Sequence, residues 1–175
     1  QEEVLCRSSA LYLTLNGDPM YAAHRERPEP DSTAWSILSP DVPVFRTDDG
    51  TPLDEPWTLG FITCAAPVAQ QVGQPRSGDL LAQRIERVLA IAAAYGYTDL
   101  VLGAWGCGAF GNHPDRTARD FRLDGATKQR SPQVAGGVSG GAAVGGRRGI
   151  VGAGGLGMEG AGLTRRRRPS SPRAT

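Results

Sequence analysis

SGDLLAQRIERVLAIAAAYGYTDLVLGAWGCGAFGNHP, residues 77–114, places a helix, a strand and a glycine-rich loop in direct succession. The first 21 residues of this stretch have apolar side chains at helical spacing, which predicts a helix with one buried stripe. Ser77 or Asp79 is expected to cap the start of this helix, and Gly96 fits the position just after its end. The apolar residues 98–105 then predict a buried strand.

The loop after this strand, residues 106–113, contains Gly106, Gly108 and Gly111. A glycine-rich backbone before a helix start can direct N–H groups at a phosphate or a diphosphate. In open α/β sheets, ligands also bind at the carboxyl ends of the strands. The spacing matches neither a P-loop nor the dinucleotide-binding fingerprint. Residue chemistry alone therefore leaves two readings open: a phosphate loop, or a tight turn whose glycines only relieve backbone strain.

The remaining segments extend this α/β pattern. Residues 57–68 predict a second buried strand, and Pro114 suits the first turn of another helix. The prolines within 34–45 predict short strand pieces at a sheet edge, joined by a turn. Residues 4–15 have helical apolar spacing, and residues 20–35 are polar and proline-rich, which predicts a loop. Strands alternating with helices indicate an α/β fold with a largely parallel sheet.

Charge divides the chain unequally. Residues 1–125 have a formal charge of −7, whereas residues 126–175 have +8, 13 glycines and no aromatic residue. A segment of this composition buries too little apolar surface to offset the entropy of ordering it, so it is expected to be disordered. We therefore expect a folded domain over residues 1–122 and a Gly/Arg-rich disordered tail over residues 123–175.

Cysteine and histidine usage argues against disulfides and metal sites. The three cysteines are scattered and odd in number, which predicts free thiols in a cytoplasmic protein. No segment has the apolar length of a membrane span. His24 is expected to be solvated in a polar loop. Cys107, His113 and Asp115 are too few to define a zinc site, so no metal and no cofactor are predicted.

Four segments, taken together, carry a family resemblance. They are QEE (residues 1–3), SPDVPVFR (39–46), RIERVLAIAAAYGYTDLVLGAWGCGAFGN (84–112), and a proline followed by a helix with Ala118 and Phe121. In this order they resemble the microbial-type poly(ADP-ribose) glycohydrolase catalytic domain, a divergent macrodomain. The resemblance runs from Gln1 to about Phe121. It implies a three-layer α/β/α fold with a central mixed sheet, incomplete here at both ends.

The same resemblance implies site residues and an activity. Glu3 matches the catalytic acid, and Glu2 matches the neighbour that holds the ribose hydroxyls of the substrate. The implied substrate-binding residues are Gln1, Gly106, Cys107, Gly108, Ala109, Phe110, Gly111 and Asn112, with residues 106–111 as the diphosphate loop. Phe110 is expected to pack near the scissile ribose. The sequence departs from the pattern of this family at two positions. Ala109 replaces the usual valine, and Val68 replaces the usual asparagine.

The implied reaction is hydrolysis of the ribose–ribose O-glycosidic bonds of poly(ADP-ribose), with ADP-ribose or its polymer on modified proteins as the partner. Successive helical residues point about 100° apart, so Glu2 and Glu3 suit one acid and one binding group rather than an acid–nucleophile pair. The alternatives are an ADP-ribose-binding macrodomain without turnover, or an inactive fragment in which both acids only favour the helix start. A monomer is expected.

The basic tail allows three interpretations. Its arginines could bind nucleic acid non-specifically, but it lacks aromatic residues that stack on bases, so nucleic acid is not an expected partner. It could be a solvated charged tail. Because the resemblance stops in mid-helix where the composition changes, the third interpretation is a reading-frame shift near residues 122–125, with the missing strand encoded in another frame.

Overall fold

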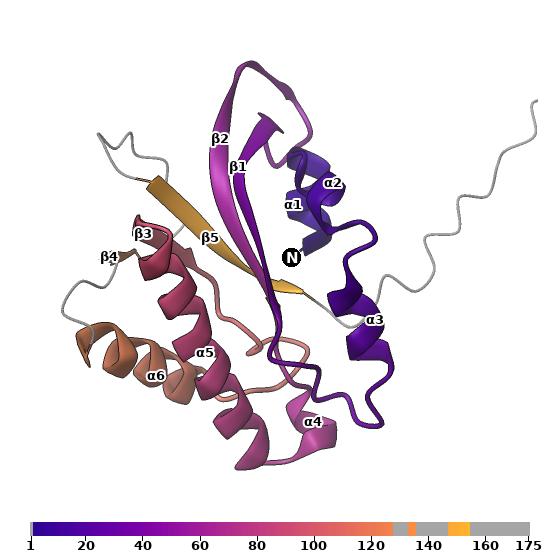
Figure 1. Cartoon of the computed structure of the whole chain (residues 1–175), viewed down its shortest axis with the longest axis vertical. Coiled ribbons are helices and arrows are strands. Elements are labelled where there is room, and N and C mark those ends of the chain that lie inside the picture. Colours follow the sequence, from indigo (N-terminus) through magenta and orange to yellow (C-terminus); the bar gives the residue numbers. More distant parts are fainter. Residues whose placement is uncertain (1, 128–132, 136–146, 155–175) are drawn as a thin grey trace, which may run out of the picture.

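The computed structural model describes residues 2–127, 133–135 and 147–154 of the 175-residue chain (Figure 1). Its helices are α1 (Glu2–Ser8), α2 (Leu11–Leu15), α3 (Pro19–Arg25), α4 (Ala69–Val72), α5 (Arg76–Ala94) and α6 (Pro114–Thr127). Its strands are β1 (Ser36–Arg46), β2 (Pro52–Ala65), β3 (Tyr97–Leu102), β4 (Gln133–Ala135) and β5 (Arg147–Gly154).

The strands form a single mixed sheet in the order β1-β2-β5-β3-β4. β1 and β2 are antiparallel, whereas β2, β5, β3 and β4 pair in parallel. Parallel neighbours require crossover connections, which the helices between β2 and β3 and after β3 supply. The α/β class and the central mixed sheet expected from the sequence are confirmed.

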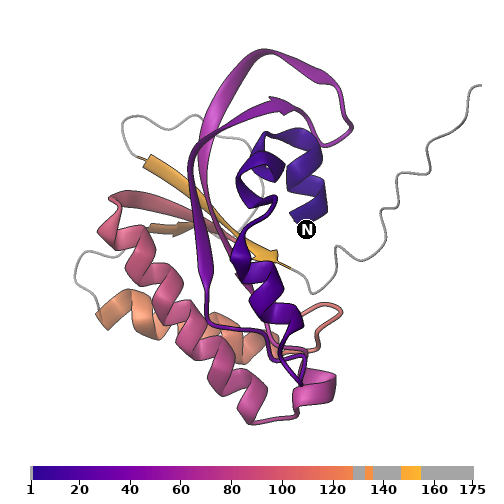
Figure 2. The same ribbon diagram turned by 45° about the vertical axis from the view of Figure 1, so that its right-hand side comes forward.

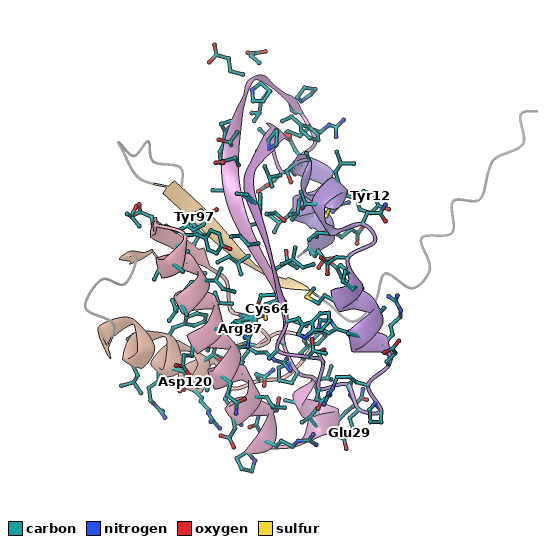
Figure 3. The ribbon with its side chains drawn as sticks, viewed as in Figure 1. Tyr12, Glu29, Cys64, Arg87, Tyr97 and Asp120 are labelled. Atoms are coloured by element: carbon teal, nitrogen blue, oxygen red, sulfur yellow. The ribbon has the colours of Figure 1, made fainter. Side chains whose placement is uncertain are left out.

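Helices cover both faces of this sheet. α5 contacts β2 and β3 and packs against α6, whereas α1 and α2 contact β1 from the opposite side (Figures 1 and 2). Alternation along β2 shows the two faces: Ile62 and Cys64 pack with α5, while Leu59 and Phe61 pack with α2. Figure 3 shows Cys64 between the strand and α5. The three-layer architecture is confirmed.

α5 is the helix expected from residues 77–97, with the predicted apolar stripe buried and Gly96 just beyond its end. Its start differs from the expectation. Pro75 precedes the helix, and neither Ser77 nor Asp79 forms a side-chain cap. Instead, Ser77 is buried, and Asp79 forms an ion pair of 2.5 Å with Arg116 of α6. Both side chains bond to other parts of the fold rather than to the helix end.

The helix expected over residues 4–15 is broken into α1 and α2. The break lies at Ser9, which forms an isolated bridge with Val44 of β1, and the Ala10 amide donates to the Pro43 carbonyl at 2.9 Å. The exposed backbone of edge strand β1 bonds to the backbone groups of Ser9 and Ala10. Those groups therefore cannot also form the hydrogen bonds of a continuous helix. Tyr12 of α2, within the segment of apolar helical spacing, is 41% exposed.

The loop expected over residues 20–35 is also partly wrong, because its first part is helix α3. The Asp18 carboxylate accepts from the Met20 amide at 2.8 Å and caps this helix. His24 is buried rather than solvated, and one of its ring nitrogens lies 2.9 Å from the Thr33 hydroxyl. Burial and the nearby Arg84 charge lower the pKa of His24.

β1 is one continuous strand, whereas the sequence predicts two pieces joined by a turn. The register with β2 shifts between Ser39 and Val42, and Asp41 has φ +51°. The prolines and the turn residues therefore produce only a local irregularity in the pairing of β1 with β2, and the strand continues past it. The edge position of β1 is confirmed, and residues 47–51 form the expected turn to β2.

The structure differs from the expected disordered tail, residues 123–175, at three places. Residues 123–127 belong to α6, residues 133–135 and 147–154 form β4 and β5, and β5 lies between β2 and β3 in the sheet. Ile150 aligns with Phe61 on one side and with Val101 on the other. A strand between two parallel neighbours satisfies its backbone hydrogen bonds on both edges, which its glycine-rich composition does not prevent. The rest of the expected tail lies outside the described residues.

Candidate functional site

The two acids proposed for chemistry lie at the start of α1. This helix begins at Glu2, and it contacts β5. Figures 1 and 2 place its first turn beside the carboxyl end of β5. Glu2 is half-buried and Glu3 is exposed, so the two carboxylates face different surroundings. Gln1 lies outside the described residues.

Glu2 has an unusual environment for a carboxylate at a helix start. Burial raises its pKa, whereas the nearby Tyr21 hydroxyl of α3 acts in the opposite direction. Burial and the negative charge of Glu2 likewise raise the pKa of Tyr21. Glu2 Oε2 and the Tyr21 hydroxyl are both shielded from solvent, and the two side chains lie close enough for each to shift the pKa of the other. Contact of Glu2 with a substrate hydroxyl stays a prediction.

The glycine-rich loop, residues 106–112, connects β3 to α6 at the carboxyl end of the strand. Two short turns shape it: the Gly111 amide donates to the Gly108 carbonyl at 2.9 Å, and the Asn112 amide donates to the Gly106 carbonyl at 3.0 Å. The structure therefore folds the predicted diphosphate loop back on itself as one compact unit.

Asn112 anchors the end of the glycine-rich loop. Its side chain is buried, and its Nδ2 donates to the Pro67 carbonyl at 2.9 Å and the Gly106 carbonyl at 3.1 Å. Its Oδ1 accepts from the Ser77 hydroxyl at 2.7 Å. Asn112 thus ties the loop to the end of β2 and to the start of α5. Both Nδ2 donors are used inside the protein, so contact of this residue with a ligand stays a prediction.

Several amide groups of the loop have no internal acceptor. Within the part of the chain that the structure describes, the N–H groups of Gly108, Ala109 and Phe110 donate to no backbone or side-chain atom. Three such amides in succession at the carboxyl end of a parallel strand form an array of donors for an anion. This array is the chemical feature that best defines the site.

The three loop glycines differ in what the fold requires of them. Gly106 and Gly111 have φ of +72° and +67°, which a residue with a Cβ rarely adopts. An added Cβ at Gly106 would also lie 2.7 Å from the Ala66 Cβ. Gly108 has neither constraint, because its φ is ordinary and a Cβ there would meet no atom within 4 Å. The fold therefore does not by itself require glycine at this position.

The other predicted site residues have identifiable neighbours. Phe110 is partly buried and packs against the core between the sheet and α5, which agrees with a core role and leaves its contact with a ribose a prediction. The Cys107 thiol lies 3.5 Å from the Thr117 hydroxyl and 3.4 Å from the Trp105 carbonyl. Ala109 contributes its backbone, since its carbonyl accepts from the Gln70 side chain.

Residues 2–127, 133–135 and 147–154 bring together no group of three or more His, Cys, Asp or Glu side chains that could hold a metal ion. None of the described helices combines the length and apolar character needed to cross a membrane.

Sequence reasoning missed Gln70 and Arg84. Gln70 of α4 donates from Nε2 to the Ala109 carbonyl at 2.9 Å. Arg84 of α5 is 2% exposed and donates to the carbonyls of Ala65, Asp31 and Ser32. An arginine within an apolar helical stripe was the available signal for Arg84. No local pattern marked Gln70, since its partner lies 39 residues away.

The acids and the loop share one end of the sheet. The start of α1 and residues 106–112 both lie toward the carboxyl ends of the parallel strands β2, β5 and β3 (Figures 1 and 2). Among the described residues, no hydrogen bond or ion pair joins Glu2 or Glu3 to the loop. A ligand that reached both would have to span them.

Comparison with known proteins supports the family resemblance. A family model, the catalytic domain of microbial-type poly(ADP-ribose) glycohydrolase (PARG), matches residues 1–47. None of the curated protein sequences matches this chain significantly.

Solved structures match over most of the chain. The poly(ADP-ribose) glycohydrolase of Thermomonospora curvata is 39% identical with a TM-score of 0.67, over 87% of this chain and 53% of that chain. The same enzyme bound to the inhibitor ADP-HPD is 37% identical with a TM-score of 0.67, over 92% and 58%. The Deinococcus radiodurans enzyme in complex with ADP-ribose is 38% identical with a TM-score of 0.71, over 86% and 60%.

These similarities confirm the resemblance to the microbial-type PARG catalytic domain and the fold it implies. The chain spans between about half and three fifths of the solved structures it matches.

Proposed function

We propose that this chain contains the ADP-ribose-binding and catalytic part of a glycosidase that hydrolyses the ribose–ribose O-glycosidic bonds of poly(ADP-ribose). The similarity to bacterial glycohydrolases, including one in complex with ADP-ribose, supports the substrate class. The substrate is ADP-ribose polymer on modified proteins. We place the protein in the cytoplasm, because its three free cysteines suit a reducing compartment.

The row of unpaired amides at Gly108, Ala109 and Phe110 is the observation that carries this proposal. A diphosphate has two adjacent negatively charged groups, and successive backbone N–H groups can donate to both. These donors carry no full charge, so no lysine or arginine has to be desolvated. The nearby start of α6 adds a partial positive charge. An anionic linker such as the diphosphate of ADP-ribose therefore fits this loop better than a neutral ligand does.

Glu3 serves as the general acid and Glu2 as the binding group in the proposed reaction. Glu3 donates a proton to the leaving ribose oxygen as the glycosidic bond breaks, and an oxocarbenium-like centre forms at the other ribose. The resulting Glu3 carboxylate takes a proton from the water that attacks this centre, which restores the acid. The half-buried Glu2 carboxylate accepts hydrogen bonds from ribose hydroxyls.

The environments of the two acids support this division of roles. Glu3 is exposed and can reach a polymer, whereas Glu2 is half-buried beside the Tyr21 hydroxyl. Adjacent helical residues point about 100° apart, so the two groups cannot act on one bond from opposite sides.

The proposal predicts that Glu3→Gln lowers the release of ADP-ribose from poly(ADP-ribose) by at least about 100-fold, since a general acid contributes 10²- to 10⁴-fold. Product release is measured by liquid chromatography and mass spectrometry. Glu55→Gln, which removes an exposed acid from β2, is the matched control and retains the wild-type rate.

A Glu3→Gln chain that cleaves the polymer at the wild-type rate would show that Glu3 is not the acid. If the wild-type chain binds ADP-ribose by calorimetry but releases none from the polymer, the chain is an ADP-ribose-binding macrodomain without turnover. If it does neither, the proposed function is wrong for this chain.

A further inference from the structure

The short helix α4 holds the glycine-rich loop from one side through two contacts to consecutive carbonyls. The Ala69 amide donates to the Phe110 carbonyl at 2.7 Å, and Gln70 Nε2 donates to the Ala109 carbonyl at 2.9 Å. The first contact is between backbone groups and survives any substitution except proline. The second depends on one side chain, that of Gln70.

The Gln70 contact determines the orientation of one peptide plane. In a trans peptide, the carbonyl of one residue and the N–H of the next point in opposite directions. With the Ala109 carbonyl directed at Gln70, the Phe110 N–H must point away from α4. Among the described residues, no other hydrogen bond holds either end of this plane, because the Phe110 amide has no acceptor. Among the described residues, Gln70 supplies the one side-chain contact to this peptide, while the Gly111–Gly108 and Ala69–Phe110 hydrogen bonds hold the backbone on either side of it.

The side chain of Gln70 lies against Gly111 of this loop. A Cβ at Gly111 would lie 2.6 Å from Gln70 Nε2 and 2.9 Å from its Cδ. Gly111 also has φ +67°, which by itself favours glycine. The absent side chain leaves the space in which the Gln70 amide reaches the loop.

We propose that Gln70 is the positioning residue of the glycine-rich loop, fixing the Ala109–Phe110 peptide so that the Phe110 N–H faces the diphosphate of ADP-ribose. This inference rests on the proposed function for its ligand. Without the Gln70 donor, the peptide loses its side-chain anchor and can tilt, which misaligns the Phe110 N–H with the diphosphate.

Gln70→Met removes the donor and keeps the length of the side chain. It is expected to weaken the binding of ADP-ribose by about threefold to tenfold, which is the value of one net hydrogen bond. Isothermal titration calorimetry with ADP-ribose measures this change. Gln71→Met is the matched control, because Gln71 is the adjacent exposed glutamine and its side chain forms no hydrogen bond among the described residues. Both variants are expected to melt within about 1 °C of the wild type, since surface changes cost little.

A second measurement needs no ligand. NMR relaxation dispersion of the Phe110 amide is expected to show exchange in unliganded Gln70→Met and none in the wild type or in Gln71→Met. Unchanged ADP-ribose affinity in Gln70→Met, or a Phe110 amide equally rigid in all three chains, would overturn the assignment. If the wild-type chain binds no ADP-ribose, the proposed function fails, and the amide measurement still decides whether Gln70 orients the loop.

Discussion

A methyl group added at Gly108 would meet no atom within 4 Å, although the neighbouring glycines of the same loop are tightly constrained. Gly106 and Gly111 are required by their positive φ and by close neighbours. Gly108 is therefore the position in this loop at which ligand binding can be tested apart from stability.

Substitutions at the loop glycines are expected to separate binding from stability. Gly108→Ala should leave the melting temperature unchanged or slightly raised, because alanine restricts the unfolded chain more than glycine does. It should weaken ADP-ribose binding by about tenfold or more, because the added methyl group would crowd a ligand that packs against the loop. Thermal melts and calorimetry on the same samples measure both effects.

Gly106→Ala provides the comparison for this prediction. It is expected to lower the free energy of unfolding by about 1 kcal/mol or more, since alanine is strained at positive φ and its methyl group would crowd Ala66. Equal losses of stability in the Gly106 and Gly108 variants would refute the distinction between the two glycines.

At the scale of elements, Arg84 joins α5 to two segments that are distant in sequence. Its guanidinium donates to the Ala65 carbonyl at the end of β2 at 2.9 Å and to the carbonyls of Asp31 and Ser32 before β1. Burial lowers the pKa of Arg84. Ala65 is the last residue of β2, and Asp31 and Ser32 lie in the segment before β1, so Arg84 joins three separate parts of the backbone.

Arg84→Met is expected to lower the free energy of unfolding by about 1–3 kcal/mol, because it leaves buried carbonyls without donors. Chemical denaturation followed by circular dichroism measures the change. Arg87→Met is the control: Arg87 is exposed and lies one turn further along α5 (Figure 3). Equal stability of the Arg84 and Arg87 variants would mean that the carbonyls find water or other donors.

At the scale of the whole molecule, strand β5 holds the two halves of the sheet together. β2 and the β1 edge lie on one side of it, and β3 and β4 lie on the other. β2 and β3 each pair with β5 and not with one another. The helices on either face cover a sheet that is continuous only through residues 147–154.

A chain ending at residue 127 is therefore expected to lose its cooperative thermal transition, because two separate strand pairs cannot form one buried sheet. Differential scanning calorimetry of this shortened chain and of the full chain measures the difference. A shortened chain that melts cooperatively near the temperature of the full chain would show that β5 is dispensable.

Several predictions from the sequence are local and hold. The apolar stripe of α5, the buried end of β2 and the start of α6 at Pro114 follow from periodicity and turn chemistry within short windows. The errors arise where a distant partner overrides a local pattern. Pairing with β1 breaks the N-terminal helix at Ser9. His24 is buried beside Thr33, which lies nine residues further along the chain.

By itself, the sequence determined the order of helix, strand and glycine-rich loop, the mixed α/β class, and the residues that resemble the microbial-type PARG catalytic domain. Periodicity, turn residues and motif spacing are properties of neighbouring residues, so a linear chain displays them. Only the tertiary structure decided that Gly108 is unconstrained, that Gln70 contacts the loop, and that residues 147–154 lie within the sheet. Each depends on contacts between segments far apart in the sequence, which no local pattern encodes.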